Sequence, residues 1–189
     1  VLDSPDINAF ATPGGYVYIN RGLIGYLQSE AQLAAVLAHE IAHITARHAT
    51  RQRRAQTASS VAAGLVAILT GSGEVGEATA LWGGAAGRGY GRDMELEADG
   101  LGARFMAKAG YDPGAVIDVL SLLKDNERQQ ALRAQETGEK RRTYHGLFAT
   151  HPRHDTRLRE VVAGAGDLIE KGEGDEGTMA FRVATDGLV

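Results

Sequence analysis

Hydrophobic and polar residues alternate along the first twenty positions as they do in β-strands. Two short β-prone runs, 7–11 and 16–19, flank Thr12-Pro13-Gly14-Gly15, a segment of turn-forming residue types. In the second run Val17 and Ile19 fall on one face, and the tyrosines beside them fall on the other. The pattern predicts an N-terminal β-hairpin with one side packed against the interior.

The next pattern has helical spacing. Ser29 and Gln32 have the arrangement of a capping box at the start of a helix. Apolar residues then recur every three or four positions, at Leu33, Val36, Leu37, Ile41 and Ile44. We therefore predict a long helix over about 30–54, preceded by a short helical turn over 21–27 with Asn20 as its cap.

Further helices are predicted downstream, so the fold class is α+β and mostly α-helical. Gly110 ends a helix that begins near Arg92, and Asp112-Pro113 starts another that runs to about Asp125. The other expected helices are two rich in small residues, over 56–70 and 74–87, and a last amphipathic one over 155–162.

The chain of 189 residues has the length of one domain. We expect this domain over residues 1–170, and its abrupt start indicates truncation at the N-terminus. Residues 171–189 begin with a stretch rich in glycine and acidic residues. This composition predicts a linker, followed by a C-terminal tail or an added strand over 181–189. For the polar residues 126–142, a helix and a mobile segment both stay open.

Composition excludes several classes of function. The formal net charge of −4 argues against a nucleic-acid-binding protein, whose surface would be basic. The chain has no cysteine, which excludes disulfides, thiolate zinc sites and a cysteine nucleophile, and suits an oxidising compartment. The longest apolar run, 61–69, is about half the roughly 20 residues that a membrane-spanning helix needs. We expect no transmembrane segment, although the small-residue region 57–89 could form a flap that touches a membrane surface.

The predicted long helix carries the sequence His39-Glu40-Ile41-Ala42-His43. Four residues advance a helix by about 400°, so the two histidines project from one face and can bind one Zn²⁺. In this HExxH arrangement the glutamate is the general base. Two surface histidines are the alternative interpretation. The apolar residues around the motif place this helix in the interior, however, where polar groups without partners are costly.

A catalytic zinc site needs a third protein ligand. Ala49 occupies the position of a third histidine in the longer HExxHxxGxxH pattern, so the ligand must come from elsewhere. Glu95 and Asp99 share one face of the predicted helix over 92–109, and Glu97 points the opposite way. Either Glu95 and Asp99 therefore act together or Glu97 acts alone, unless all three form a solvated acidic stripe paired with arginines.

Several segments resemble one family in the same order along the chain. The segments are the HExxH motif with Arg47-His48 after it, the acidic stretch 95–99, Thr150-His151-Pro152 with Arg157, the opening 8–19 and the stretch 109–113. Together they resemble the gluzincin metallopeptidase family that includes the CAAX prenyl protease, HtpX and BepA. The likeness covers most of residues 5–160 and is greatest for the soluble, BepA-like branch.

The resemblance implies roles for residues outside the motif. Glu95 becomes the third ligand of one Zn²⁺ per chain, and Asp99 becomes the partner that holds a ligating histidine. His151 corresponds to a late histidine that stabilises the transition state or blocks the open position of the metal. Arg157 corresponds to an arginine that pairs with a carboxylate and positions the loop around His151. We interpret His48 as structural rather than as a ligand.

These features predict a gluzincin-like zinc endopeptidase that hydrolyses misfolded or envelope proteins in the bacterial periplasm or cell envelope. Polypeptide substrates would add as a strand to the edge of the hairpin, at Asn8, Ala9, Phe10 and Ala11. The alternative is a chaperone-like or scaffolding protein with a latent or structural zinc site, which His151 as a fourth ligand would favour. A helical partner-binding module with a fortuitous HExxH would bind no metal.

Overall fold

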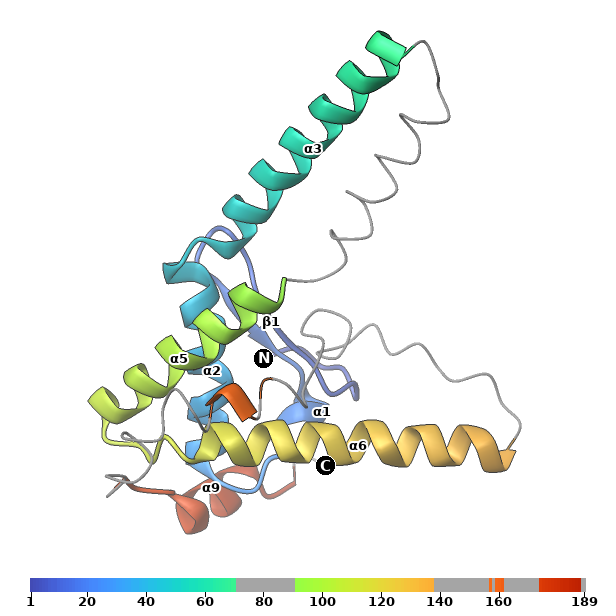
Figure 1. Cartoon of the computed structure of the whole chain (residues 1–189). Coiled ribbons are helices and arrows are strands. Elements are labelled where there is room, and N and C mark those ends of the chain that lie inside the picture. Colours follow the sequence, from blue (N-terminus) through green and yellow to red (C-terminus); the bar gives the residue numbers. More distant parts are fainter. Residues whose placement is uncertain (71–90, 138–156, 158, 162–173, 188–189) are drawn as a thin grey trace.

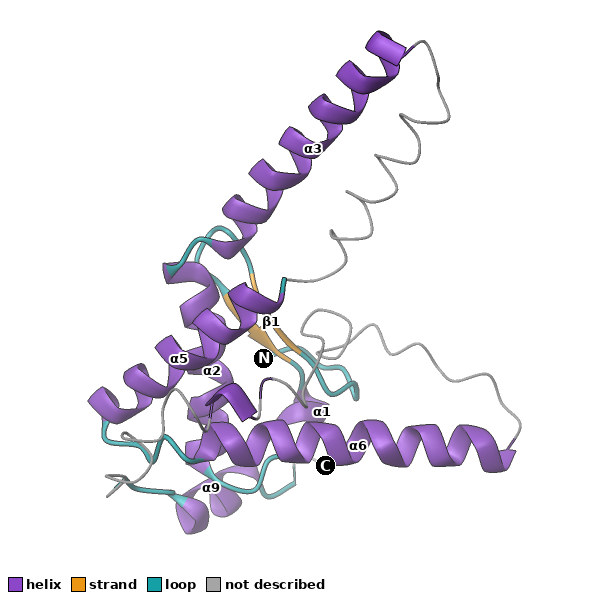
Figure 2. Ribbon diagram, in the orientation of Figure 1, coloured by secondary structure: helices purple, strands orange, loops and turns teal. Residues whose placement is uncertain are grey.

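The structure is a computed structural model that describes residues 1–70, 91–137, 157, 159–161 and 174–187. Helices dominate these residues, and one small hairpin packs beside them (Figure 2), which confirms the predicted fold class. The elements are β1 (Ala9–Ala11), β2 (Val17–Ile19), α1 (Arg21–Ile24), α2 (Glu30–Thr45), α3 (His48–Thr70), α5 (Arg92–Ala109), α6 (Ala115–Thr137) and α9 (Thr178–Thr185).

Helix α2 is the centre of the described fold. It contacts α5, α6, α9 and the hairpin (Figure 1), and residues from all of these elements join one hydrophobic core. As predicted, Ser29 caps the helix: its side chain accepts a hydrogen bond from the backbone N–H of Gln32 at 3.2 Å. Half of the buried residues of α2 are alanines, whose small side chains let neighbouring helices approach closely. Ile41, predicted to be part of the buried face, is 43% exposed.

The hairpin has the predicted form. Strands β1 and β2 are antiparallel, with Ala9 opposite Ile19 and Ala11 opposite Val17. Leu2 forms an isolated bridge with Asn20, just after β2, and donates its backbone N–H to the carbonyl of Ile19 at 2.8 Å. The described sheet thus consists of β1 and β2 alone.

The long helix predicted over 30–54 is interrupted, which corrects the prediction. Helix α2 ends at Thr45, and α3 begins at His48 and continues to Thr70 as one helix. Between them Arg47 has a φ of 56°, in the left-handed region that side chains disfavour. This residue breaks the hydrogen-bonded ladder and turns the chain, so α3 extends away from the rest of the described fold (Figure 1). The helix expected over 74–87 lies outside the described residues.

Gly110 ends α5 in a left-handed conformation with a φ of 85°, as its sequence position predicts. The side chain of Asp112 then accepts a hydrogen bond from the backbone N–H of Gly114 at 2.8 Å, just before α6 begins. Helix α6 continues past Asp125 to Thr137, so the first part of the polar segment 126–142 is helical. No helix in the described part of the chain combines the length and hydrophobicity that crossing a bilayer requires.

The C-terminal segment forms a helix where a strand was the alternative. Over 178–185 the chain forms α9, which corrects that expectation, and its Phe181 is 6% exposed within the common core. The stretch before it is held by backbone hydrogen bonds: the N–H of Ala31 donates to the carbonyl of Glu176 at 3.0 Å. Residues 174–187 therefore pack on the same core as α2, and the boundary predicted at residue 170 lies outside the described residues.

Candidate metal centre

Two histidines of α2 and a glutamate of α5 converge at one point. Nε2 of His39 lies 3.0 Å from Nε2 of His43. The carboxylate oxygens of Glu95 lie 3.6 Å from the His39 nitrogen and 3.5 Å from the His43 nitrogen. The side chains are only 12%, 1% and 0% exposed, so the point where they meet is largely shielded from solvent. The structure thus brings together the three residues predicted to hold a metal.

The donor atoms suit a zinc ion in kind and in spacing. Two imidazole nitrogens and one carboxylate oxygen form a ligand set that catalytic zinc sites use, with a further position left open. Bonds of about 2.0–2.1 Å that meet near the tetrahedral angle place their donor atoms about 3.3 Å apart. The separations between the donor atoms here lie on both sides of that value, and one potential ligand atom from each residue lies within 4.8 Å of the others.

The packing of α5 against α2 selects between the two carboxylate alternatives. Glu95 and Asp99 are four positions apart on α5, and both are buried and directed at α2. The side chain of Glu97 is 41% exposed and binds Arg51 of α3 instead. Glu95 and Asp99 therefore both lie beside the HExxH histidines, and Glu97 contacts neither of them in the described structure.

Behind His39 lies a carboxylate that is itself paired. Nδ1 of His39 is 2.9 Å from Oδ1 of Asp99, and Arg157 donates two hydrogen bonds to Asp99, at 2.8 Å from Nε and 2.6 Å from Nη2. Nη1 of Arg157 also lies 3.1 Å from Glu95. Arg157 thus pairs with a carboxylate, as the resemblance implies, and holds two acidic side chains at once.

These contacts shift pKa values in opposite directions. Burial alone would raise the pKa of Asp99, but the charge and hydrogen bonds of Arg157, together with His39, lower it to about 2. Burial alone would lower the pKa of His39, but its hydrogen bonds to Asp99 and Glu95 raise it above the ordinary 6.5. Asp99 is therefore ionised at neutral pH. Its carboxylate can accept a hydrogen bond from the protonated Nδ1 of His39.

Behind His43 lies a contact that the sequence did not predict. Nδ1 of His48 is 2.8 Å from Nδ1 of His43, and Nε2 of His48 is 3.2 Å from Oε2 of Glu97. That oxygen also accepts a hydrogen bond from Arg51 at 2.7 Å. His48 is 0% exposed, and burial lowers its pKa. Arg51 lowers the pKa of Glu97, so the line of contacts ends in a charged pair.

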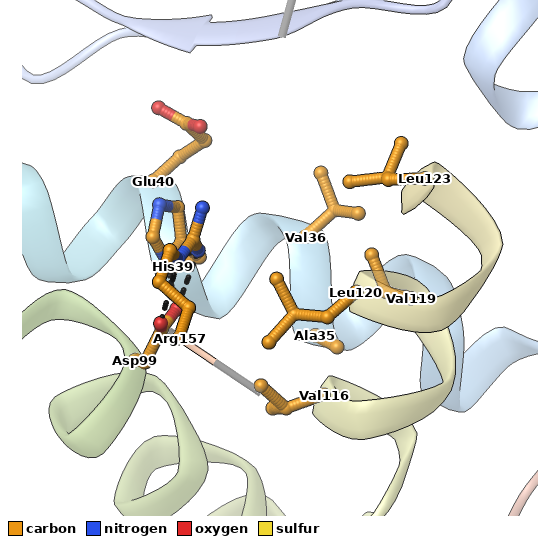
Figure 3. Close-up of a pocket in the computed structure, with 10 residues that line it drawn as sticks. All are labelled: Ala35, Val36, His39, Glu40, Asp99, Val116, Val119, Leu120, Leu123 and Arg157. Carbon is orange, nitrogen blue, oxygen red and sulfur yellow. Dashed lines mark hydrogen bonds and ion pairs between the residues drawn. The ribbon is translucent and has the colours of Figure 1, made fainter. Parts of the chain in front are cut away.

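Glu40 follows His39 on α2 and is 1% exposed. It lines a pocket with His39, Asp99 and Arg157 (Figure 3), in which its carboxylate points away from Asp99. The other wall of this pocket is apolar and comes mainly from α6, through Val116, Val119, Leu120 and Leu123. Glu40 therefore lies at a small cavity whose apolar wall is part of the hydrophobic core.

The remaining predicted site residues are His151 and the stretch 8–11. His151 lies outside the described residues. Asn8, Ala9, Phe10 and Ala11 form or precede β1, which packs against α2, the helix of the two histidines. Their role in binding a substrate stays a prediction.

Comparison with known proteins agrees with the resemblance. Residues 1–164 match the model of peptidase family M48. A beta-barrel assembly-enhancing protease of Escherichia coli (strain K12) is 34% identical over 171 residues, which cover 85% of this chain and 33% of the relative. The mitochondrial metalloendopeptidase OMA1 of Schizosaccharomyces pombe is 33% identical over 162 residues, 85% of this chain and 44% of the relative. The chain thus spans about a third to less than half of these relatives, and it belongs to peptidase family M48.

Proposed function

We propose that this chain is the catalytic domain of a zinc-dependent endopeptidase. The observation that carries the proposal is the meeting of His39, His43 and Glu95 from two helices, with donor atoms at the spacing of zinc ligands. Family membership supports metal-dependent peptide hydrolysis. Zinc is the ion that this set of donors favours, because two imidazoles and one carboxylate form a common catalytic zinc site.

When bound, zinc supplies Lewis acidity, which lowers the pKa of a coordinated water and polarises a peptide carbonyl. Glu40 acts as the general base: its carboxylate, next to His39 on α2, accepts a proton from water and returns it to the leaving amine. Glu40 is buried, so its carboxylate is held away from bulk solvent.

The partners behind the ligands keep them oriented. A proton on Nδ1 of His39 is donated to Asp99, so Nε2 presents its lone pair to the metal. Arg157 holds Asp99 with two hydrogen bonds and also contacts Glu95, which fixes both carboxylates relative to α2. We assign His151 the stabilisation of the oxyanion or the blocking of the open metal position.

For the substrate we propose an extended polypeptide. β1 is an edge strand of the described two-stranded sheet, so a peptide could add beside Asn8–Ala11 through main-chain hydrogen bonds. Main-chain recognition tolerates many sequences, which suits degradation of misfolded or envelope proteins.

We place the protein in the bacterial periplasm or cell envelope. Its lack of cysteine suits an oxidising compartment. Several relatives are named for the assembly of beta-barrels, and the transmembrane class of β-barrel is found in the bacterial outer membrane. Contact of residues 57–89 with a membrane surface stays part of this proposal: Ile68 and Leu69, at the end of α3, are 78% and 84% exposed.

The test compares cleavage of unfolded casein with metal content in the zinc-loaded protein. Glu40→Gln should retain one zinc per chain and lose at least about 100-fold in cleavage rate, because a general base contributes that much or more. Glu136→Gln, which neutralises an exposed glutamate at the end of α6, should leave both unchanged. A chelator should abolish cleavage by the wild type, and added zinc should restore it.

Two outcomes would contradict the proposal. If Glu40→Gln cleaves casein at the wild-type rate, Glu40 is not the general base. A wild-type protein that binds one zinc per chain but cleaves nothing would favour the chaperone-like or scaffolding alternative.

A further inference from the structure

Four polar side chains form a line from the candidate metal centre to the surface. Nδ1 of His43 faces Nδ1 of His48 at 2.8 Å, Nε2 of His48 faces Glu97 at 3.2 Å, and Glu97 binds Arg51 at 2.7 Å. The two imidazoles are 1% and 0% exposed, whereas Glu97 and Arg51 are 41% and 47% exposed. The line therefore connects a buried ligand of α2 with a charged pair formed by α3 and α5.

The contact between the two histidines depends on the break between α2 and α3. On a continuous helix, residues five apart differ by about 500°, or about 140° around the axis, so their side chains point in different directions. The left-handed conformation of Arg47 turns the chain between His43 and His48 and brings the two rings together edge to face. Such a conformation costs roughly 1–2 kcal/mol for a residue with a side chain. The fold thus contains a strained residue at the position that makes this contact possible.

Among the described contacts, the positions of the donors and acceptors fit one assignment of protons when Nε2 of His43 binds a metal. The remaining nitrogen of His43, Nδ1, then carries the proton and donates it to Nδ1 of His48. His48 consequently carries its own proton on Nε2, which faces a carboxylate oxygen of Glu97. Arg51 completes the line as a donor to the same oxygen. Each donor thus meets an acceptor along the whole line.

The two ligating histidines are therefore supported in different ways. A carboxylate lies directly behind His39, where Asp99 is held by Arg157. Behind His43 the imidazole of His48 comes first, and the carboxylate of Glu97 lies beyond it. Groups in such positions fix the tautomer and ring orientation of a metal-binding histidine, and their loss weakens metal binding.

We propose that His48 is a positioning residue of the metal centre, which holds His43 in the tautomer and orientation that metal binding requires. Glu97 and Arg51 hold His48 in turn. The inference rests on the proposed function, because it requires His43 to be a metal ligand.

The test compares two substitutions that differ in one property. In His48→Gln the side-chain oxygen can accept the proton of His43, and the amide nitrogen can donate to Glu97. In His48→Phe a ring of similar shape remains but the acceptor is lost. We expect zinc affinity, measured by competition with a chromophoric chelator, to fall by about 10–100-fold in His48→Phe and by less than about tenfold in His48→Gln.

A second measurement reports the tautomers directly. Long-range ¹H–¹⁵N spectra of the zinc-loaded wild type should show His43 protonated at Nδ1, and His48 protonated at Nε2 but not at Nδ1. A purely structural role for His48 predicts a change in the stability of the metal-free protein with unchanged zinc affinity. Wild-type affinity in a folded His48→Phe, or a proton on Nδ1 of His48 with zinc bound, would overturn the inference.

The two proposals fail in different ways. If the wild type binds zinc but cleaves no peptide, the proposed activity fails, and weaker binding by His48→Phe still supports the role of His48. If the wild type binds no zinc, both proposals fall. If the wild type binds zinc and cleaves peptide, and His48→Phe binds zinc as tightly as the wild type, only the role proposed for His48 is wrong.

Discussion

Gly102 of α5 lies against the backbone of His39 of α2. A Cβ atom at position 102 would come within 3.3 Å of the backbone nitrogen of His39 and 3.5 Å of its Cα. The missing side chain lets α5 approach α2 at the level of the first HExxH histidine. Because Glu95 and Asp99 project from the same helix toward α2, this close approach brings their carboxylates to the two histidines.

Filling this contact should separate the two helices. Gly102→Val adds a branched side chain against the α2 backbone, so we expect a loss of about 1–3 kcal/mol in the free energy of unfolding, with weaker zinc binding. Gly100→Ala on the same helix is the control, because its Cβ would meet only a flexible arginine end at 4.0 Å. That variant should gain about 0.5–1 kcal/mol through helix propensity. Urea unfolding measures the stability of each variant, and competition with a chelator measures its zinc affinity. Equal stability and equal zinc affinity of the two variants would refute the close contact between Gly102 and α2.

Arg157 should contribute far more to stability than an exposed arginine with a similar partner. It is 5% exposed and contacts two buried carboxylates, so Arg157→Leu leaves Asp99 and Glu95 without their cation. We expect the metal-free protein to lose about 3–5 kcal/mol in the free energy of unfolding. Arg92→Leu removes an ion pair with Glu160 at 3.1 Å whose side chains are about half exposed, and should cost at most about 1 kcal/mol. Similar losses in urea unfolding would contradict the buried pairing.

Two acidic residues near the start of α5 should differ sharply in their effect on metal content. Glu95 is 0% exposed and faces both histidines, whereas Asp93 is on the exposed side of the helix. Glu95→Gln replaces a carboxylate ligand with a poorly coordinating amide, so bound zinc after dialysis should fall well below one per chain. Asp93→Asn should retain one zinc per chain. Full zinc retention by Glu95→Gln would show that the third ligand is another residue.

Much of this site follows from helical spacing alone. The separation of His39 and His43 by four residues requires them to share a face, and the same rule pairs Glu95 with Asp99. Spacing could not predict which carboxylates face the interior, because it does not show which side of a helix packs against the rest of the protein. The packing of α5 against α2 buries Glu95 and leaves Glu97 half exposed.

The break after α2 could not be predicted from the same patterns. No glycine or proline lies between Thr45 and His48, and the chain continues with good helix formers. Arg47 nevertheless adopts a left-handed conformation. The contact between His43 and His48 follows from that turn, so periodicity gave no signal for it. Helix ends marked by a glycine could be predicted: Gly110 ends α5 at the expected position.

The last prediction concerns the C-terminal segment, for which a tail or an added strand over 181–189 was expected. Instead α9 is a helix that places Phe181 in the core beside α2 and leaves Val183 77% exposed. Phe181→Ala should therefore cost about 3–5 kcal/mol in the free energy of unfolding, because it leaves a cavity in a packed interior. Val183→Ala, two residues away on the same helix, should change it by no more than about 0.5 kcal/mol. Urea unfolding of the two variants shows whether α9 is part of the core: equal midpoints would mean that α9 does not pack on α2 in solution.

Because α2 carries both HExxH histidines, loss of the Phe181 side chain should also weaken zinc binding, whereas truncation of Val183 should not.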